Sequence, residues 1–111
     1  MKTEKIAETL RDALRIPVYP ERAPRLEMCA VYKLLPAEND GVRETVKIRV
    51  RVFAPSYLRV CELTDRIAAA FLRDGEEPAE LHYSRTGETQ SGRFAGWWFM
   101  ETRYMCVGRS Q

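Results

Sequence analysis

The chain has 111 residues, of which 45% are hydrophobic and 31% charged, with a formal net charge of +2. This length predicts one domain over residues 1–111 with a core of modest size. No apolar run approaches the ~20 residues that a membrane-spanning helix needs, and scattered N-terminal charges exclude a secretory signal. We therefore expect a cytoplasmic protein without a membrane partner. The near-balanced charge is also unlike the strongly basic composition of a dedicated nucleic-acid-binding domain.

The N-terminal residues predict a helix followed by a proline-rich segment. Residues 4–15 have apolar side chains at three- and four-residue spacing, with Thr3 suited to cap the helix and Pro17 to end it. The expected buried stripe consists of Ile6, Leu10, Ala13 and Leu14. Three prolines in residues 17–24 allow only a short edge strand at Val18 and Tyr19.

Residues 26–53 predict a long β-hairpin. Residues 26–35, LEMCAVYKLL, are apolar on both faces, which is typical of a strand inside a sheet. The segment PAENDG, residues 36–41, has the composition of a turn. Residues 42–53 then alternate strictly, and this alternation predicts a strand with one apolar and one charged face. The apolar face carries Val46, Ile48, Val50 and Val52, and the charged face carries Lys47, Arg49 and Arg51.

A second helix and a second hairpin are expected in the remaining residues. Ser56 is placed to cap a helix over 57–73, Gly75 to terminate it, and Glu62 to pair with Arg66. Its expected buried stripe consists of Val60, Leu63, Thr64, Ile67, Ala70 and Phe71. Strands are expected over 79–86 and 94–107, joined by a polar turn over 87–92, with Gly96 at a bulge.

The order of these elements is helix, hairpin, helix, hairpin. This order predicts an α+β fold with a mostly antiparallel sheet of about four strands and two helices packed on one of its faces.

No pattern of catalytic, cofactor-binding or metal-ligating residues is present. His82 is the only histidine, and the glycines are too dispersed to form a phosphate-binding loop. The cysteines, Cys29, Cys61 and Cys106, form no C-x-x-C pair and lie in apolar runs, so we expect buried reduced thiols. We therefore expect a protein that is not an enzyme and that needs no cofactor or metal ion.

The charged face of the strand over 42–53 has three interpretations. Lys47, Arg49 and Arg51 could form a solvated face, balanced by acidic residues such as Glu27 and Glu101 on neighbouring strands. They could instead contact nucleic acid or another subunit. A twelve-residue strand extends about 40 Å, against a diameter of ~35 Å for a domain of this size. The hairpin must cross the whole sheet or protrude, and a protruding hairpin favours the subunit interpretation.

An aromatic run, Trp97-Trp98-Phe99, adds a second candidate surface. In a strand Trp97 and Phe99 share one face and Trp98 takes the other, and only one of these faces can meet the helices. A loop or another subunit must cover the remaining aromatic area. The candidate interface residues for a subunit or tube contact are therefore Lys47, Arg49, Arg51, Trp97 and Phe99. Reversing both Arg49 and Arg51 to Glu is expected to hinder assembly while leaving the monomer folded.

The pattern of elements resembles that of the small tail terminator or tail completion proteins of long-tailed bacteriophages and prophages, the minor tail protein U type and its relatives. The segments that carry the resemblance span most of the chain. They are the helix IAETLRDAL with PVYPERAP, the strands CAVYKLL and ETVKIRVRVFAPSY, the helix YLRVCELTDRIAAAF and the closing strand ETRYMCVGRS. The run GWWFM matches no feature of that family.

The resemblance implies an α+β subunit of a homo-oligomeric ring, typically a hexamer. Such a ring caps the tail tube, contacts the tube protein and the head–tail connector, and leaves a passage for DNA. It implies a protein made in the host cytoplasm during assembly and then located in the virion tail. Two alternatives remain open at this point: another head–tail joining or neck protein, and a small nucleic-acid-binding α+β module.

Overall fold

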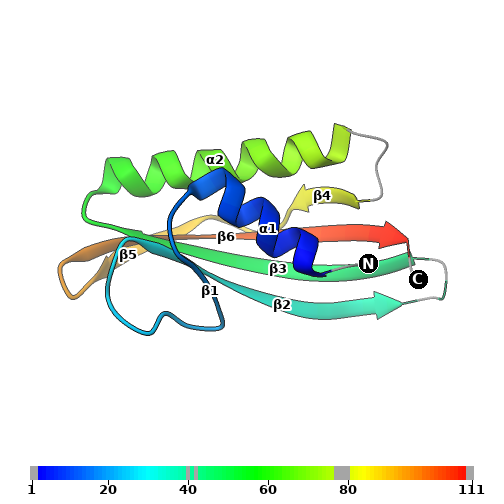
Figure 1. Ribbon diagram of the computed structural model, residues 1–111, viewed down its shortest axis with the longest axis horizontal. Coiled ribbons are helices and arrows are strands. Elements are labelled where there is room, and N and C mark those ends of the chain that lie inside the picture. The colour runs from blue at the N-terminus through cyan, green and yellow to red at the C-terminus, as the bar shows by residue number, and fades with distance from the viewer. Residues whose placement is uncertain (1–2, 40, 42, 77–80, 110–111) are drawn as a thin grey trace.

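Two helices lie over one face of a six-stranded sheet (Figure 1). The structure is a computed structural model, and it describes residues 3–39, 41, 43–76 and 81–109. In chain order the elements are α1 (Thr3–Leu14), β1 (Val18–Pro20), β2 (Cys29–Asn39), β3 (Arg43–Ala54), α2 (Tyr57–Glu76), β4 (Leu81–Arg85), β5 (Gln90–Phe94) and β6 (Trp97–Arg109). The α+β class expected from the sequence is confirmed.

The sheet is mixed and has more strands than the sequence predicts. Its order is β1-β2-β3-β6-β4, with β5 also paired to β6. Strand β1 runs parallel to β2, with Val18 opposite Ala30, because the chain between them loops back before β2 begins. The expected number of about four strands is therefore wrong. Among the described strands, β1–β2 is the one parallel pair, and the other pairs are antiparallel.

The last hairpin turns at a different place from the one that the sequence predicts. Residues 87–92 do not form the turn, because β5 continues from Gln90 and pairs with β6 as far as Phe94 opposite Trp97. The turn is Ala95-Gly96, whose φ angles of 51° and 82° are both left-handed, as a two-residue hairpin turn of type I′ requires. Gly96 is thus a turn residue and not a bulge.

The long hairpin, β2–β3, is confirmed, and it crosses the sheet instead of protruding. Strand β2 extends through residues 36–39, which the sequence assigns to the turn, and its register shifts between Pro36 and Glu38. Strand β3 is paired along its whole length, to β2 on one side and to β6 on the other. From the length of the strand, the hairpin could either cross the sheet or protrude. It crosses the sheet, and the molecule is 45 Å long.

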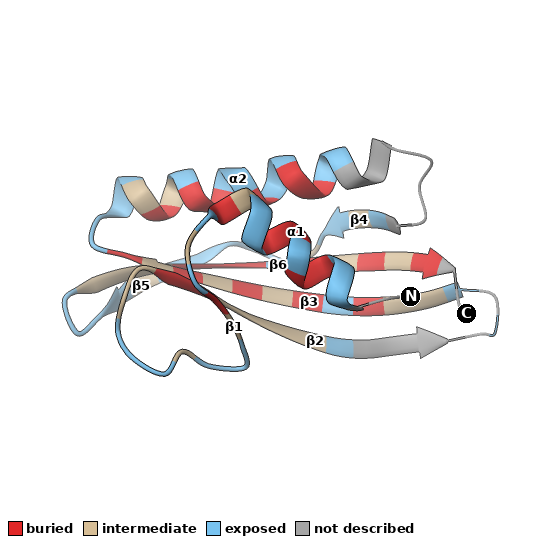
Figure 2. Ribbon diagram, in the orientation of Figure 1, coloured by how far each residue is buried: buried red, intermediate tan, exposed pale blue. Residues whose placement is uncertain are grey.

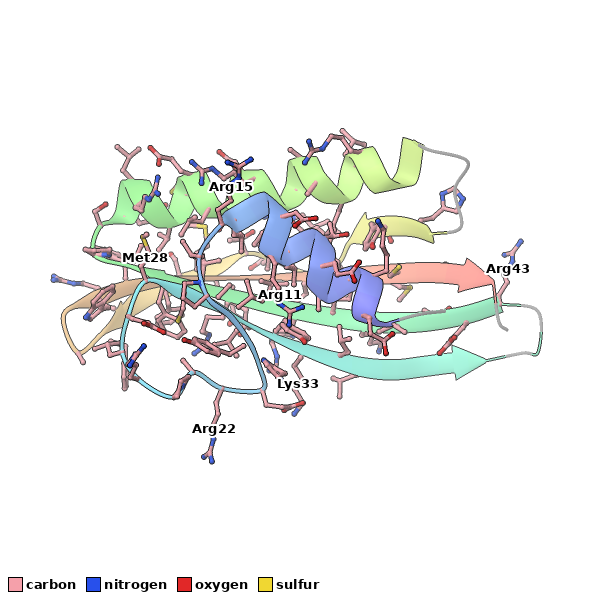
Figure 3. The ribbon with its side chains drawn as sticks, viewed as in Figure 1. Arg11, Arg15, Arg22, Met28, Lys33 and Arg43 are labelled. Carbon is pink, nitrogen blue, oxygen red and sulfur yellow. The ribbon has the colours of Figure 1, made fainter. Side chains whose placement is uncertain are left out.

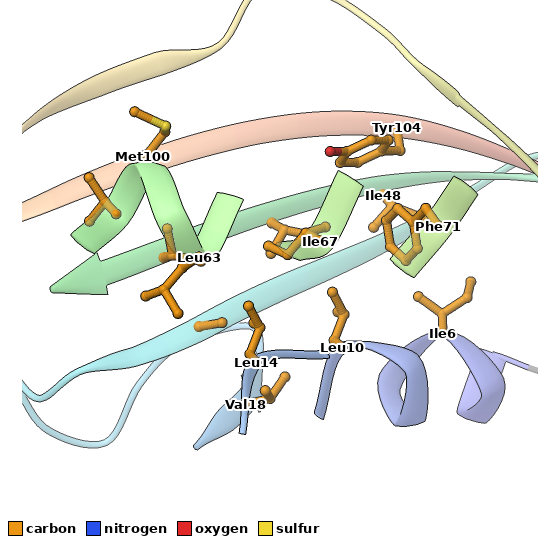
Figure 4. Packing of buried hydrophobic residues seen from close by; sticks show 14 of the residues in the cluster. Ile6, Leu10, Leu14, Val18, Ile48, Leu63, Ile67, Phe71, Met100 and Tyr104 are labelled. Carbon is orange, nitrogen blue, oxygen red and sulfur yellow. The ribbon is translucent and has the colours of Figure 1, made fainter. Parts of the chain in front are cut away.

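The hydrophobic core lies between the helices and the sheet (Figures 2 and 4). Ile6, Leu10 and Leu14 point from α1 towards side chains of α2 and the sheet. All six residues of the expected α2 stripe are buried: Val60, Leu63, Thr64, Ile67, Ala70 and Phe71. Each fully buried aliphatic or aromatic side chain of this size contributes about 1.5–3 kcal/mol to the free energy of folding.

The ends of α2 agree with the sequence prediction only in part. Ser56 caps the helix, because its Oγ accepts a hydrogen bond of 3.2 Å from the backbone N–H of Arg59. The helix continues through Gly75 to Glu76, so Gly75 does not end it. Glu62 pairs with Arg59 at 2.8 Å and not with Arg66, since a residue three positions away on a helix is as close as one four away.

Replacing Ala95 by Asn should stabilise the protein. The backbone of Ala95 is left-handed, a conformation in which its Cβ lies close to the following carbonyl oxygen. Asn adopts this conformation more readily than Ala, particularly before Gly in a type I′ turn. We expect the free energy of unfolding to rise by about 0.5–1 kcal/mol in Ala95→Asn, as measured by urea denaturation. The control Ala69→Asn, on the exposed side of α2, should lose a few tenths of a kcal/mol through helix propensity. A decrease for Ala95→Asn would contradict this turn geometry.

Candidate interface on the open sheet face

The sheet has one face without helices, which we call the open face. Strand β3 alternates, so burial of Val46, Ile48, Val50 and Val52 under the helices turns Lys47, Arg49, Arg51 and Phe53 to the open face. The register of β3 with β6 adds Phe99, Glu101 and Arg103 to this face, and the register with β2 adds Val31 and Lys33. The sequence prediction that Lys47, Arg49 and Arg51 lie away from the core is confirmed.

A groove of about 580 Å³ lies on the open face. One side is the loop that follows β1, residues 21–27, and the other is the end of the sheet near the β5–β6 turn. Cationic and apolar side chains both line the groove, among them Lys33, Arg49, Phe53, Phe94 and Phe99. Figure 3 shows Arg22 on the loop, with its side chain pointing outward, and Lys33 on β2. The groove therefore combines positive charge with apolar surface.

Arg51 is held on the open face by its contacts, although its side chain is 41% exposed. Its Nη2 lies 3.1 Å from Oε1 of Glu101, and its guanidinium lies over the ring of Phe99 at 4.5 Å from the centroid. Glu101 is only 4% exposed, and Arg103 Nη2 approaches its other carboxylate oxygen at 3.4 Å. Two arginines thus balance one buried carboxylate, which would otherwise be strongly destabilising. This agrees with the predicted neutralisation by Glu101, and it makes Arg51 a structural residue.

A row of three cations crosses the open face at Arg49, and we call it the cation row. Lys33 on β2 lies directly opposite Arg49 on β3, and Arg49 lies directly opposite Arg103 on β6. Within the described part of the chain no carboxylate lies within 4 Å of Lys33 or Arg49. Like charges directly opposite each other across strands destabilise a sheet. The free energy of folding therefore does not explain why Arg49 stands between two other cations.

Glu27 does not neutralise the cation row, so that part of the sequence expectation is wrong. Its carboxylate accepts hydrogen bonds from the Tyr19 hydroxyl and, at 3.2 Å, from Nε of Arg25. The bond from Tyr19 lowers the pKa of Glu27 and raises the pKa of Tyr19. These contacts join β1 to the loop beside the groove and hold the loop in place.

Cys29 also lines the groove. Burial raises the pKa of Cys29 to about 11, so this thiol stays protonated at neutral pH.

The aromatic run at the start of β6 divides between the two faces, as predicted. Trp98 lies on the helix side, where its ring makes an edge contact with Tyr57 at 5.3 Å. Phe99 lies on the open face, tilted against Phe53 at 6.3 Å. Gly92 packs so closely against Phe99 that a Cβ there would lie 2.9 Å from the ring. Phe99 is therefore held by its neighbours on several sides.

The structure brings together only part of the predicted interface. Arg49, Arg51 and Phe99 line the groove. Lys47 lines a second hollow of about 390 Å³ beside it, and Trp97 lines neither.

Sequence reasoning missed three residues of this face, Lys33, Arg103 and Phe94. Lys33 and Arg103 complete the cation row, and Phe94 stands 63% exposed at the edge of the groove. The correct strand registers would have revealed the first two, because both lie directly opposite Arg49.

Other kinds of site have little support among the residues that the structure describes. No three His, Cys, Asp or Glu side chains there are grouped as ligands of a metal ion would be. Within the same residues, neither helix combines the length and apolarity needed to cross a membrane.

Comparison with known proteins gives a structural likeness and no sequence family. No protein-family model and no curated protein matches the chain. Among solved structures, a chain of the "Virion of native gene transfer agent (GTA) particle" is similar, with a TM-score of 0.60 and 8% sequence identity. The likeness covers 95% of this chain and 92% of that chain. At this identity it shows a shared fold over nearly the full length of both chains.

The same substitution at two neighbouring positions of β3 should have opposite effects on stability. Arg49→Glu replaces two repulsive cross-strand pairs with two attractive ones, so we expect the free energy of unfolding to rise by about 0.5–1 kcal/mol. Arg51→Glu removes a partner of the buried Glu101 and adds a like charge beside it, so we expect a loss of about 2–4 kcal/mol. Urea denaturation of both variants at neutral pH measures these changes.

Salt supplies the control for this pair of variants. The gain in Arg49→Glu should shrink in about 1 M NaCl, because the Debye length there is only about 3 Å. A destabilised Arg49→Glu at low salt would contradict the like-charge account of the cation row.

Proposed function

We propose that the chain is a structural subunit of a phage-like virion, and more specifically a tail terminator-like subunit. In this proposal six copies form a ring that caps the tail tube and joins it to the head–tail connector. The observation that carries the proposal is the fold shared with a chain of a gene transfer agent virion over 95% of this chain. The resemblance of the sequence pattern to tail terminators supports the more specific role.

Surface chemistry supports assembly through two different faces. The open face offers the cation row and the groove. On the opposite side of the molecule, α2 exposes Leu58 and Leu72, which are 70% and 66% exposed. A ring of identical subunits needs two such unlike surfaces, because each copy binds the next in a head-to-tail manner. We therefore assign α2 to one side of the contact between subunits. The open face then forms the other side of that contact or binds the tube.

Another head–tail joining or neck protein is the second candidate, since the shared fold with a virion chain supports it equally. The proposal assigns the chain no catalytic activity, cofactor or metal ion. DNA passing through the ring would need no sequence-specific contact. The proposed location is the host cytoplasm during assembly and then the virion tail.

Native mass in solution tests the ring. We expect light scattering over a concentration series to show a hexamer or a monomer–hexamer equilibrium for the parent chain. Lys47→Glu/Arg49→Glu should shift that equilibrium towards monomer, because both cations lie on the open face without a described carboxylate partner. This pair replaces reversal of Arg49 and Arg51, because Arg51 holds Glu101 and its reversal would destabilise the monomer, so that a loss of assembly could not be assigned to the open face alone.

The control is Arg11→Glu, which changes the charge equally at an exposed position of α1, away from both proposed surfaces. It should assemble like the parent chain. If the parent chain is monomeric, the same variants are compared for their ability to limit the length of tubes formed by tail tube protein. A monomer that leaves tube length unchanged would refute the terminator role.

A further inference from the structure

We propose that the open-face groove binds an extended acidic segment of a partner protein, whose carboxylates pair with the cation row and whose apolar side chain enters the groove. This proposal rests on the proposed function, in that it takes the open face to be an assembly surface. It adds the chemistry of the partner, which the fold and the resemblance leave open.

Charge complementarity identifies the polar part of the partner. Lys33, Arg49 and Arg103 stand side by side on three adjacent strands, and only Arg103 contacts a carboxylate among the described residues. Strands are about 4.8 Å apart, so the row spans about 9.6 Å. Alternate side chains of an extended peptide lie about 6.7 Å apart on one face. Two alternate carboxylates therefore fit between the three cations and remove their mutual repulsion.

The apolar lining identifies the second part of the partner. Phe53 and Val31 lie on the strands beside the cation row, and Leu26 and Phe94 stand at the edge of the groove, 44% and 63% exposed. An aliphatic or aromatic residue two positions beyond the second acidic residue would share their face of the extended segment and could cover this surface. Cations beside an apolar groove thus select a segment that is acidic and also carries an apolar side chain.

Several features favour a peptide over single-stranded nucleic acid. A base needs a free aromatic face on which to stack. Phe99 offers no such face, because the guanidinium of Arg51 covers it and Gly92 packs against it, which leaves Phe94 at the edge of the groove as the exposed ring. The groove also contains the carboxylates of Glu21, Glu27 and Glu101, which would repel a continuous line of phosphates. Discrete carboxylates on a peptide can meet the cation row without passing these groups.

An NMR titration of the full-length chain tests the proposal. The probe is the peptide acetyl-ESESL-amide, in which the two Glu and the Leu are alternate residues and therefore share one face of an extended chain, and the comparison probes are acetyl-KSKSL-amide, acetyl-ESESG-amide and a short oligothymidylate. We expect the acidic leucine peptide to shift the backbone amide signals of Lys33, Arg49 and Phe53, and to leave those of α2 unchanged. The basic peptide should have no effect, and the glycine peptide should bind more weakly, because it lacks the apolar side chain.

Two variants locate the binding site. Arg49→Ala should weaken binding of the acidic peptide about tenfold or more, since it removes the centre of the cation row. Lys33→Ala tests the same row independently, and Arg11→Ala on α1 is the matched control that should bind like the parent chain. The spectrum of each free variant shows directly whether it is folded.

The outcomes separate this proposal from the proposed function. No shift at the groove with millimolar acidic peptide, or equal binding by Arg49→Ala and Arg11→Ala, overturns the groove proposal even if the ring forms. Binding of oligothymidylate that depends on Arg49, without peptide binding, assigns the groove to nucleic acid and also overturns it. Peptide binding that depends on Arg49, in a chain that neither forms rings nor limits tube length, supports the groove and refutes the ring.

Discussion

The pairing of β3 with a neighbour on each side is the constraint on which the rest of the structure depends. Every residue of β3 from Arg43 to Ala54 lies opposite a residue of β6, and nearly all lie opposite a residue of β2. Because strand side chains alternate, a slip of one residue would exchange Val50 for Arg49 in the core. The same register of β3 therefore buries the valines under the helices and exposes the cations on the open face.

Two arginines on β3 show how neighbours decide the role of a residue type. Arg51 lies opposite Glu101, which is buried, and its cation contributes to folding. Arg49, two residues earlier on the same face, lies between Lys33 and Arg103, and its cation opposes folding. Such local conflict with stability is expected where a surface serves binding, since binding sites tolerate arrangements that folding alone disfavours. The contrast separates the structural part of this charged face from the part available to a partner.

Periodicity was sufficient to predict the helices, the buried stripe of α2 and the alternation of β3, because each depends on residues close in sequence. In the predicted stripe of α1 only Ala13 is not buried, since its side chain is partly exposed. Registers were not predictable in this way. A turn over residues 36–41 would have placed Lys33 opposite Glu44, whereas β2 continues to Asn39 and places Lys33 opposite Arg49. Because the sequence pattern places the turn at the wrong residues, it does not predict that the three cations of the cation row lie side by side. Ala95 gives no turn signal, and the contact between Tyr19 and Glu27 that fixes the loop beside the groove depends on tertiary structure.

If the chain assembles as proposed, the uncovered sheet face would couple its assembly to its folding. Charged side chains keep this face in contact with water in the free chain, but the three cations of the cation row repel one another in the folded state. An acidic partner would remove that repulsion and add favourable ion pairs. The free energy of binding would then include the relief of repulsion as well as the new contacts. The same repulsion disfavours stacking of two open faces against each other, because equal charges would meet. A chain built in this way is directed away from contacts between two open faces and towards an oppositely charged surface.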